Sequence, residues 1–422
     1  MTSRLLIEPQ KLAGSLTIQP SKSLSHRALI CAALAKGNSL IKNLGTSVDI
    51  TATQTALKSL GLAKFTETAD GLLVQGGLSP VAAAEVDCRE SGSTLRFLLP
   101  LAAALGIEVL FTGQGRLLER PLGLYLEALN QGGAQIKRTQ AGLLVTGQLQ
   151  AGTYRLAGNV SSQYISGLML ALPLLAEDSQ IEIIGSLQSV GYVRLTEEVL
   201  HNFSARLEWE KQQIIIRSGA YQAADFTVEG DWSHAAFFLA AGLLGSDIIC
   251  GGLNTKSLQG DRDICRILVN MGGQMERLPQ GLKMTAATLS SSVIDACQVP
   301  DLVPPLAVAA CKVTGTTTIL GAQRLRIKES DRLAAVADLL NTLGGEVRET
   351  TDGLVIKGRG YLQGGRVSAW GDHRIAMSAA VAATICRQPL LLSEWQCVSK
   401  SAPQFWQEYA ALGGVTHERF YG

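Results

Sequence analysis

The chain has 422 residues, more than one ordinary hydrophobic core holds, so we expect two or more domains. Hydrophobic residues make up 46% and charged residues 17%, which indicates a compact globular protein and excludes a disordered or fibrous one. The 37 Lys and Arg residues balance 36 Asp and Glu residues, so no overall charge favours nucleic acid or a membrane surface as a partner.

The cysteines and the apolar segments indicate in which cell compartment the protein is found and whether it binds a metal. The eight cysteines are scattered, without a CxxC pair or a His at ligand spacing, which favours reduced, buried thiols over disulfides or zinc. No stretch reaches the roughly 18 apolar residues of a membrane span, and the first residues lack a signal-peptide core. Acidic clusters with metal spacing are absent. We therefore expect a cytoplasmic protein without metal or organic cofactor.

Internal repeats follow one another along the chain. A Gly-Gly or Leu-Gly doublet, degenerate in one copy, recurs about every 70 residues, anchored at Gly61, Gly133, Ala205, Gly273, Gly345 and Gly414. Each doublet follows an amphipathic helix-like segment and leads into two apolar strands joined by a glycine turn, although the last copy is truncated. Such units are too large for a solenoid, so we predict six α/β subdomains arranged as two domains of three.

Five further segments are nearly continuous in Ala, Leu and Val: residues 26–35, 94–105, 162–176, 233–244 and 373–384. Helices that are apolar on all sides are buried helices. We therefore predict parallel helices inside each domain and sheets outside.

Three cationic clusters lie far apart in the sequence, at Pro20 to Arg27, Ile327 to Arg332 and Gly371 to Arg374. The middle cluster has two bases, two carboxylates and a hydroxyl within six residues, directly before an apolar helix-like run. Such a helix start can hold an anion beside a titratable group. The three clusters together predict one small polyanion bound from several sides.

With this repeat, these clusters and these helices, the chain resembles the 5-enolpyruvylshikimate-3-phosphate synthase family of enolpyruvyl transferases over essentially its whole length. The resemblance implies two inside-out α/β barrel-like domains, each of three βαβαββ repeats. It implies a lower domain at 21–229, on the shikimate 3-phosphate side, and a discontinuous upper domain at 1–20 and 230–422. Hinge crossings are then expected near residues 20 and 230.

The reaction that the resemblance implies belongs to the shikimate pathway of aromatic amino acid biosynthesis. The enolpyruvyl group of phosphoenolpyruvate is transferred to the 5-hydroxyl of shikimate 3-phosphate, and phosphate is released. The mechanism is addition followed by elimination, through a tetrahedral intermediate. Both substrates carry phosphate and carboxylate groups, for which Arg offers bidentate contacts and Lys a point charge that can also move a proton.

Motif matches in the first part of the chain imply substrate-binding residues. For phosphoenolpyruvate they imply Lys22, Gly92, Arg120 and Gln163. For shikimate 3-phosphate they imply Ser23, Arg27, Ser161, Ser162, Ser189 and Tyr192. Considered one at a time, these residues also have purely structural interpretations. A serine can be a helix N-cap, the Pro after Arg120 can begin a helix, and Tyr192 can be an ordinary loop residue.

Motif matches in the second part imply the acid–base groups. Asp301 is the implied acceptor of the 5-hydroxyl proton and Glu329 the group for the methylene proton, but which carboxylate serves which proton stays open. Lys22 and His373 complete the implied catalytic set. The remaining implied contacts are Arg324 and Lys328 for shikimate 3-phosphate, and Arg332, Arg374 and Lys400 for phosphoenolpyruvate.

Three places depart from the family pattern: Glu90 and Arg324 each stand where relatives often have Asn, and Ser401-Ala402-Pro403 replaces the usual Ser/Thr-Phe-Pro after Lys400. Gly92 keeps the small residue that lets the backbone approach phosphoenolpyruvate. An Ala there would crowd the phosphonate of the inhibitor glyphosate, so we expect this chain to be inhibited by glyphosate. We further expect a monomer.

Two alternatives stay open. A sister family transfers enolpyruvate to UDP-N-acetylglucosamine, but it usually carries a reactive Cys or Asp on a mobile loop, and residues 113–121 contain no Cys. A non-catalytic anion-binding paralogue is the other alternative, and phosphate release with both substrates separates it from an enzyme.

Overall fold

The computed structural model describes residues Thr2–Tyr421 and divides them into two compact units. The continuous unit is Pro20–Glu229. The split unit combines the described residues up to Gln19 with those from Gly230 onward. The chain therefore passes between the units twice, at residues 19–20 and 229–230.

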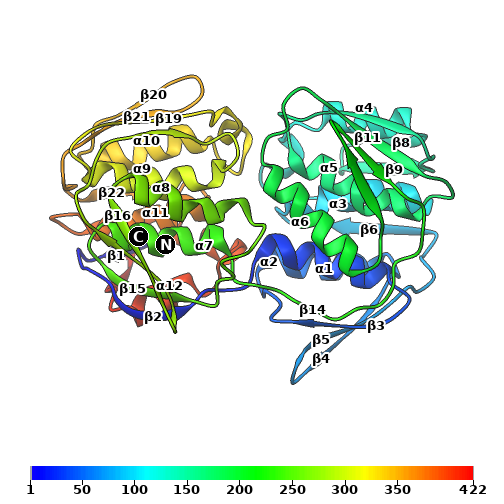
Figure 1. Ribbon diagram of the computed structural model, residues 1–422, viewed down its shortest axis with the longest axis horizontal. Helices are drawn as coiled ribbons and strands as arrows, with labels where there is room; N and C mark the ends of the chain where they lie inside the picture. The colour runs from blue at the N-terminus through cyan, green and yellow to red at the C-terminus, as the bar shows by residue number, and fades with distance from the viewer. Residues whose placement is uncertain (1, 422) are drawn as a thin grey trace. The chain divides into compact units, whose positions relative to one another are not determined.

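Six four-stranded sheets, three in each unit, repeat one topology (Figure 1). In each sheet the first strand runs parallel to the second, and the third and fourth strands are antiparallel to their neighbours. The strand orders are β14-β3-β5-β4, β6-β7-β9-β8 and β10-β11-β13-β12 in the continuous unit, and β2-β15-β17-β16, β18-β19-β21-β20 and β22-β23-β1-β24 in the split unit. The six predicted α/β subdomains, three to a unit, are confirmed.

The elements of the continuous unit follow the predicted order of strands and helices. Its strands are β3 (Gly37–Lys42), β4 (Lys64–Thr68), β5 (Gly71–Gly76), β6 (Ala83–Asp87), β7 (Glu108–Thr112), β8 (Ala134–Arg138), β9 (Leu143–Gly147), β10 (Thr153–Ala157), β11 (Ser179–Ile184), β12 (Leu207–Glu210), β13 (Gln213–Ile216) and β14 (Phe226–Thr227). Its helices are α1 (Lys22–Leu34), α2 (Val48–Ser59), α3 (Gly92–Leu105), α4 (Gly123–Gln131), α5 (Ser162–Ala171) and α6 (Val190–Asn202), with 3-10 helices η1 (Leu117–Glu119) and η2 (Leu172–Leu174).

The split unit repeats this order. Its strands are β1 (Thr2–Ile7), β2 (Ala13–Thr17), β15 (Asp247–Gly251), β16 (Gly273–Leu278), β17 (Gly281–Ala286), β18 (Val293–Asp295), β19 (Gly315–Leu320), β20 (Val347–Glu349), β21 (Leu354–Gly358), β22 (Gly365–Ser368), β23 (Leu390–Ser393) and β24 (Thr416–Tyr421). Its helices are α7 (Trp232–Leu243), α8 (Ile264–Asn270), α9 (Val303–Lys312), α10 (Arg332–Thr342), α11 (His373–Ala383) and α12 (Phe405–Ala411), with 3-10 helices η3 (Gly260–Asp263), η4 (Pro300–Leu302), η5 (Gln323–Ile327) and η6 (Trp395–Lys400).

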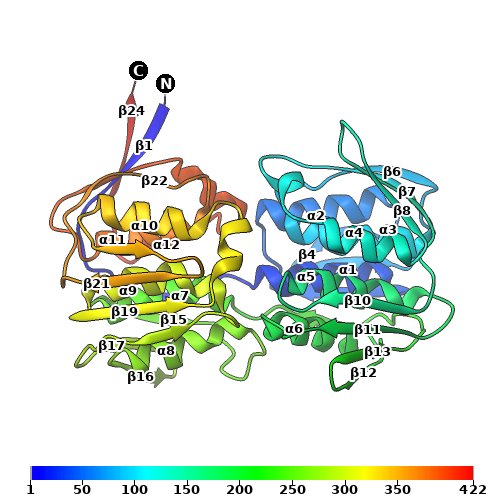
Figure 2. The ribbon, with the colours of Figure 1, turned by 90° about the horizontal axis from the view of Figure 1, so that it is seen from above.

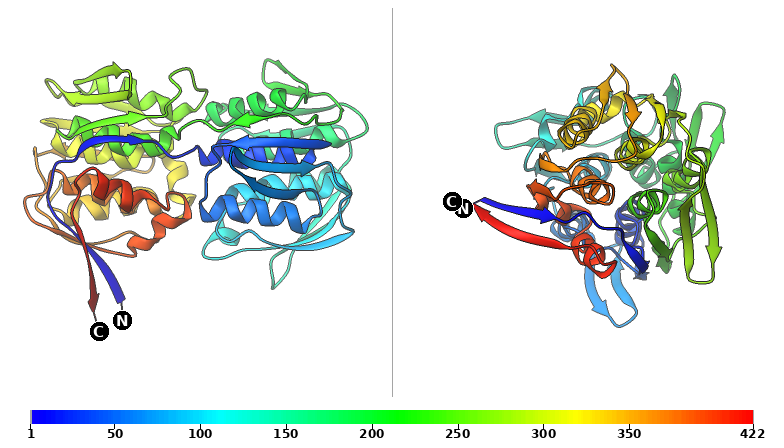
Figure 3. Two further views of the ribbon diagram at one scale, coloured as in Figure 1. Left: turned by 90° about the horizontal axis from the view of Figure 1, so that it is seen from below. Right: turned by 90° about the vertical axis from the view of Figure 1, so that its left-hand side faces the viewer.

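Three of the six sheets are completed by a strand from a distant part of the sequence. β14 joins β3 and β2 joins β15, each in parallel. β1 lies between β23 and β24 and pairs antiparallel with both. The last repeat appeared truncated in the sequence because its second hairpin strand is β1, from the opposite end of the chain. Figures 2 and 3 show the ends of β1 and β24 extending side by side from the split unit.

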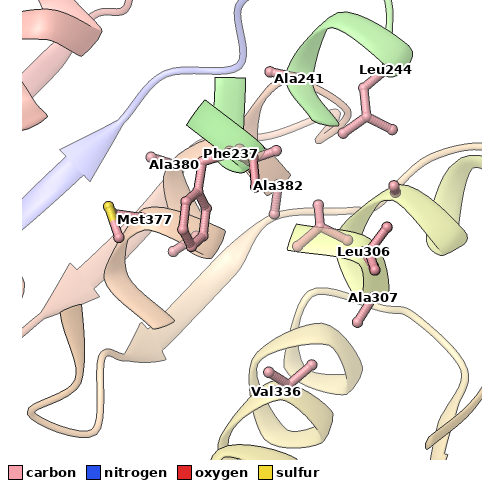
Figure 4. Packing of buried hydrophobic residues seen from close by; sticks show 14 of the residues in the cluster. Phe237, Ala241, Leu244, Leu306, Ala307, Val336, Met377, Ala380 and Ala382 are labelled. Carbon is pink, nitrogen blue, oxygen red and sulfur yellow. The ribbon is translucent and has the colours of Figure 1, made fainter. Parts of the chain in front are cut away.

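Buried helices form the interior of each unit. In the split unit α7, α9 and α11 pack against one another, and nearly every one of their residues is buried. Figure 4 shows Phe237 of α7, Leu306 of α9 and Met377 of α11 within this core. α1, α3 and α5 are buried in the same way in the continuous unit. The prediction of helices inside and sheets outside is confirmed.

One helix boundary differs from the expected one. The apolar segment 162–176 forms α5 only as far as Ala171 and continues as η2. Pro173 lies in η2, and a proline lacks the N–H that an α-helix interior requires.

All eight cysteines are free thiols. Cys31, Cys88, Cys250 and Cys311 are buried, as predicted, and the other four are half-buried. Between Thr2 and Tyr421 no helix is long and apolar enough to cross a membrane.

Glycines allow the central strands to touch the ends of the buried helices. A Cβ at Gly76, the last residue of β5, would lie 2.0 Å from the Ala32 carbonyl oxygen of α1. The corresponding Gly358 of β21 has the same constraint, since a Cβ there would lie 1.7 Å from Val313 O. Backbone atoms at these distances cannot move aside without shifting the helix.

We predict that Gly76→Ala lowers the free energy of unfolding by about 1–3 kcal/mol, because overpacking shifts the backbone of α1. Urea unfolding of the purified protein measures this loss. Gly123→Ala is the matched control: nothing lies within 4 Å of its Cβ position in α4, and helix propensity favours Ala there. Equal stability of the Gly76→Ala variant and the parent would contradict the proposed close contact.

Candidate active site

Arg332, at the first position of α10, binds three carboxylates of the split unit. Its Nε donates to Asp372 Oδ2 (2.7 Å), its Nη1 to Asp301 Oδ1 (2.8 Å) and its Nη2 to Glu329 Oε2 (2.7 Å). The guanidinium is 2% exposed. Burial tends to lower the pKa of Arg332, but Asp372, Glu329 and Asp301 raise it above its usual value. The sequence predicted Arg332 as a ligand residue; the structure gives it these protein partners.

Asp301, in η4, lies among cations from three segments. Besides Arg332, Lys328 Nζ lies 3.7 Å from its Oδ1 and Arg374 Nη2 lies 3.5 Å from its Oδ2. Arg374 Nη1 also donates to the Asp301 carbonyl oxygen (3.1 Å). Burial tends to raise the pKa of Asp301, but Arg374, Lys328 and Arg332 together hold it well below its usual range. Asp301 and Glu329, the two predicted acid–base groups, are thus held on neighbouring nitrogens of one guanidinium.

Asp372 fixes the start of α11 against the start of α10. As the N-cap of α11 it accepts from the Arg374 N–H (2.9 Å), and its other oxygen accepts from Ser330 Oγ (3.1 Å) and Arg332. It is fully buried and paired to a cation, as buried charges require. Asp372 lies within the predicted cluster at Gly371 to Arg374, but no motif assigned it a role; its position directly before a helix was the signal for a cap.

The remaining predicted residues of the split unit are all buried. Arg324 in η5 donates to the Cys297 carbonyl oxygen (2.8 Å). His373 follows the cap of α11, and its Nδ1 lies 3.7 Å from Asp372 Oδ1, beyond hydrogen-bond distance. Lys400 ends η6. The structure brings Asp301, Lys328, Glu329, Arg332 and Arg374 together through direct ion pairs.

In the continuous unit, Lys22 begins α1 and forms an ion pair with Asp49 of α2 (2.8 Å). Asp49 is buried and Lys22 is partly exposed. Ser21, not Ser23, is the N-cap of α1. Asp49 was not predicted as a site residue, because it belongs to no motif.

Arg27 is buried inside the continuous unit. Its Nε donates to Thr196 Oγ1 (2.7 Å), its Nη1 to the Ser23 carbonyl oxygen (2.7 Å), and its Nη2 to Ser166 Oγ (3.2 Å) and the Tyr192 carbonyl oxygen (3.1 Å). Its guanidinium also lies 4.9 Å from the centre of the Phe97 ring. Arg27 therefore joins α1 to α5 and α6, a role that the motif match did not indicate.

Gly92 lies at the start of α3, beside two arginines. A Cβ at Gly92 would lie 2.4 Å from Arg96 Nη1 and 3.0 Å from Arg120 Nη1. Arg96 Nη1 donates to Gln163 Oε1 (2.8 Å), and Gln163 Nε2 donates to Ser93 Oγ (2.9 Å). The predicted residues Gly92, Arg120 and Gln163 are thus neighbours. Arg96 was missed because its position, inside a buried apolar helix, resembles a core position.

The serines predicted for a phosphate lie at two helix starts. Ser161 is the N-cap of α5 and accepts from the Gln163 N–H (3.3 Å), and Ser162 is buried in the first turn. Ser189 precedes α6 with φ 54°, a left-handed conformation that is uncommon for a residue with a side chain. Tyr192 follows in the first turn of α6. Helix starts offer free N–H groups to an anion.

No group of three or more His, Cys, Asp or Glu side chains that could hold a metal ion occurs within residues 2–421. The buried carboxylates described above are each paired with a cation. Cations gather around buried carboxylates in the split unit, and cations with helix starts occur in the continuous unit. Each arrangement can bind anions, and the split unit adds two carboxylates able to exchange protons.

Comparison with known proteins identifies the family. The family model described as EPSP synthase (3-phosphoshikimate 1-carboxyvinyltransferase) matches residues 6–409. A 3-phosphoshikimate 1-carboxyvinyltransferase of Clostridium kluyveri is 46% identical over 418 residues, which cover 98% of each chain. One of Clostridium acetobutylicum is 43% identical over 420 residues, also 98% of each chain.

Solved structures agree with the fold. EPSP synthase from Acinetobacter baumannii has a TM-score of 0.81 at 26% identity, covering 99% of this chain and 100% of that one. The enolpyruvyl transferase NikO from Streptomyces tendae also has a TM-score of 0.81 at 16% identity, over 100% of both chains, a likeness of fold alone. The chain belongs to the EPSP synthase (3-phosphoshikimate 1-carboxyvinyltransferase) family.

Proposed function

We propose that the chain is a 3-phosphoshikimate 1-carboxyvinyltransferase of the shikimate pathway. It transfers the enolpyruvyl group of phosphoenolpyruvate to the 5-hydroxyl of shikimate 3-phosphate and releases phosphate. Family membership over nearly the whole chain supports this activity. The single observation that carries the chemistry is that one buried guanidinium, Arg332, orients both Asp301 and Glu329.

The charges around Asp301 suggest how substrate binding starts the addition step. Without an anion nearby, Arg374, Lys328 and Arg332 hold the pKa of Asp301 far too low, despite its burial, for an efficient base. An anionic substrate draws Lys328 and Arg374 toward itself, because phosphate and carboxylate groups bind these cations strongly. Asp301 then becomes more basic and accepts the 5-hydroxyl proton, while Glu329 delivers a proton to the methylene carbon.

The collapse of the tetrahedral intermediate reverses these proton movements. One carboxylate removes a methyl proton as phosphate departs, and Lys22 and His373 are proposed to assist the leaving group. The substrates are proposed to bind separate sets of residues. The residues proposed to bind phosphoenolpyruvate are Lys22, Gly92, Arg120, Gln163, Arg332, Arg374 and Lys400. The residues proposed to bind shikimate 3-phosphate are Ser23, Arg27, Ser161, Ser162, Ser189, Tyr192, Arg324 and Lys328, with Asp301 at its ring hydroxyls. The division into a lower domain, at 21–229, and an upper one is part of this proposal.

We further propose that the protein is a cytoplasmic monomer, needs no metal or organic cofactor and has no nucleic-acid or membrane partner. Its nearly balanced charge supports the absence of a polyanionic macromolecular partner. Light scattering measures the oligomeric state, and turnover in the presence of a chelator tests the metal requirement.

We predict that Glu329→Gln lowers the rate of phosphate release by about 100-fold or more, because general acid–base groups contribute about 10²–10⁴ to a rate. The measurement is phosphate release from phosphoenolpyruvate and shikimate 3-phosphate. Glu346→Gln, at an exposed carboxylate paired with Lys357 and Arg359, is the control and should turn over like the parent.

The same assay separates the alternatives. If the folded parent releases phosphate only with UDP-N-acetylglucosamine, the protein is an enzyme of the sister type. If neither acceptor supports release, it is a non-catalytic anion-binding paralogue. A Glu329→Gln variant as fast as the parent would remove Glu329 from the chemistry.

We predict that glyphosate inhibits the parent and that Gly92→Ala weakens this inhibition more than tenfold while it raises KM for phosphoenolpyruvate less. The added methyl group would lie 2.4 Å from Arg96 Nη1, so Arg96 must move away from Gln163. Inhibition constants at several phosphoenolpyruvate concentrations measure the effect, where tenfold corresponds to about 1.4 kcal/mol. Unchanged inhibition of Gly92→Ala would refute the steric explanation, and Gly123→Ala should leave inhibition unaltered.

A further inference from the structure

Asp261 is a buried carboxylate that neither the sequence motifs nor the proposed mechanism uses. It lies in η3 and is 2% exposed. Its Oδ2 accepts a hydrogen bond from the Ser233 hydroxyl, in the first turn of α7. Its Oδ1 is buried and has no hydrogen-bond partner among the described residues. Unsatisfied carboxylate oxygens in a protein interior are costly and call for an explanation.

The segment that carries Asp261 is held firmly at the start of α7. Gln259 Nε2 donates to the Gly230 carbonyl oxygen (2.9 Å), and Gln259 Oε1 accepts from the Trp232 N–H (3.1 Å). η3 and η4, the element that contains Asp301, both pack against α7. Asp261 and Asp301 therefore lie on two short helices that both pack against α7.

The charges that act on Asp261 come from each neighbouring element. Asp301 belongs to η4, Arg374 to α11, and Asp231 is the N-cap of α7. Burial first, and then Asp301, raise the pKa of Asp261 to about 7, whereas Arg374 and the Ser233 hydroxyl act in the opposite direction. The two carboxyl groups thus differ in charge below neutral pH: Asp301 is ionised, whereas Asp261 keeps its proton until the pH approaches about 7.

We propose that Asp261 is a positioning residue for the reaction: it holds a proton while substrates bind, which leaves Arg374 and the cations around Asp301 available to them. This inference rests on the proposed function. Lys328, Arg332 and Arg374 carry three positive charges, against the two negative charges of Asp301 and Asp372 and the carboxyl of Glu329, which is negative until it takes up the proton that it delivers. Ionised Asp261 adds a further negative charge that competes for Arg374. Because both substrates are anions, their affinity must fall when Asp261 loses its proton.

We predict a pH dependence that Asp261→Asn abolishes. In the parent, KM for phosphoenolpyruvate rises roughly three- to tenfold between pH 6 and 8, since one pKa unit corresponds to a factor of ten. In Asp261→Asn, which carries no charge at any pH, the rise is less than twofold. The substrates ionise in the same way in both assays. A difference between the parent and Asp261→Asn in how KM depends on pH is therefore caused by the ionisation of a group of the protein. Identical profiles would overturn the proposal.

Two further variants sharpen the test. Ser233→Ala removes a hydrogen bond that favours the ionised carboxylate, so the pKa of Asp261 rises and the increase in KM moves to higher pH. A shift to lower pH, or none, would contradict the assignment even if Asp261→Asn failed to fold. Asp263→Asn is the matched control in the same 3-10 helix, since Asp263 is only half-buried and is paired with the exposed Arg266, and its profile should follow that of the parent.

Protein stability gives a readout that does not depend on turnover. The pKa of Asp261 is raised in the folded protein, so this group binds more protons in the folded than in the unfolded state between about pH 4 and 7. Asp261 therefore contributes a decrease in the free energy of unfolding as the pH rises over this range, and this contribution is absent from Asp261→Asn. If stability shows this difference but no reaction occurs, the proposed function fails and the raised pKa stands. If turnover occurs without either pH effect, the proposal for Asp261 fails alone.

Discussion

The guanidinium of Arg332 is the contact on which the rest of the split-unit site depends. It joins η4 through Asp301, the turn before α10 through Glu329 and the start of α11 through Asp372. Removing one partner of a buried ion pair costs about 3–5 kcal/mol, because the remaining charges stay buried without compensation. The same contact that holds three segments together thus sets the positions of both candidate acid–base groups. Stability and chemistry cannot be varied independently at this residue.

Much of the fold could be predicted from the sequence. The glycine doublets, the hairpin turns and the apolar helices recur with the repeat, and each is a local pattern that survives in a single sequence. The strands that complete three sheets could not be predicted this way: β14, β2 and β1 pair with strands far away in the chain. A strand's composition indicates that it pairs, but not with which partner, because register and neighbour are set by the whole unit.

The candidate site was predictable in composition and less so in geometry. The clusters identified Lys328, Glu329 and Arg374, which do lie around Asp301. Arg27 was predicted as a ligand residue, yet its donors bind Thr196, Ser166 and two carbonyl groups. Asp261 and Arg96 had no signal, because a charged residue within an apolar or turn-rich stretch has the same sequence signature whether it faces a site or solvent. Side-chain direction follows from tertiary packing, which the motifs do not encode.

The strand exchange between the two ends of the chain has a consequence for synthesis on the ribosome. The continuous unit closes once β14 emerges near residue 227, so all its sheets can form while the second half of the chain is still being made. The sheet that contains β1 must wait for β24, nearly the full length of the protein later. Contacts between such distant segments form slowly, since a long loop must be closed first. β1, whose second half is Leu5-Leu6-Ile7, therefore stays unpaired longest while the chain is being made.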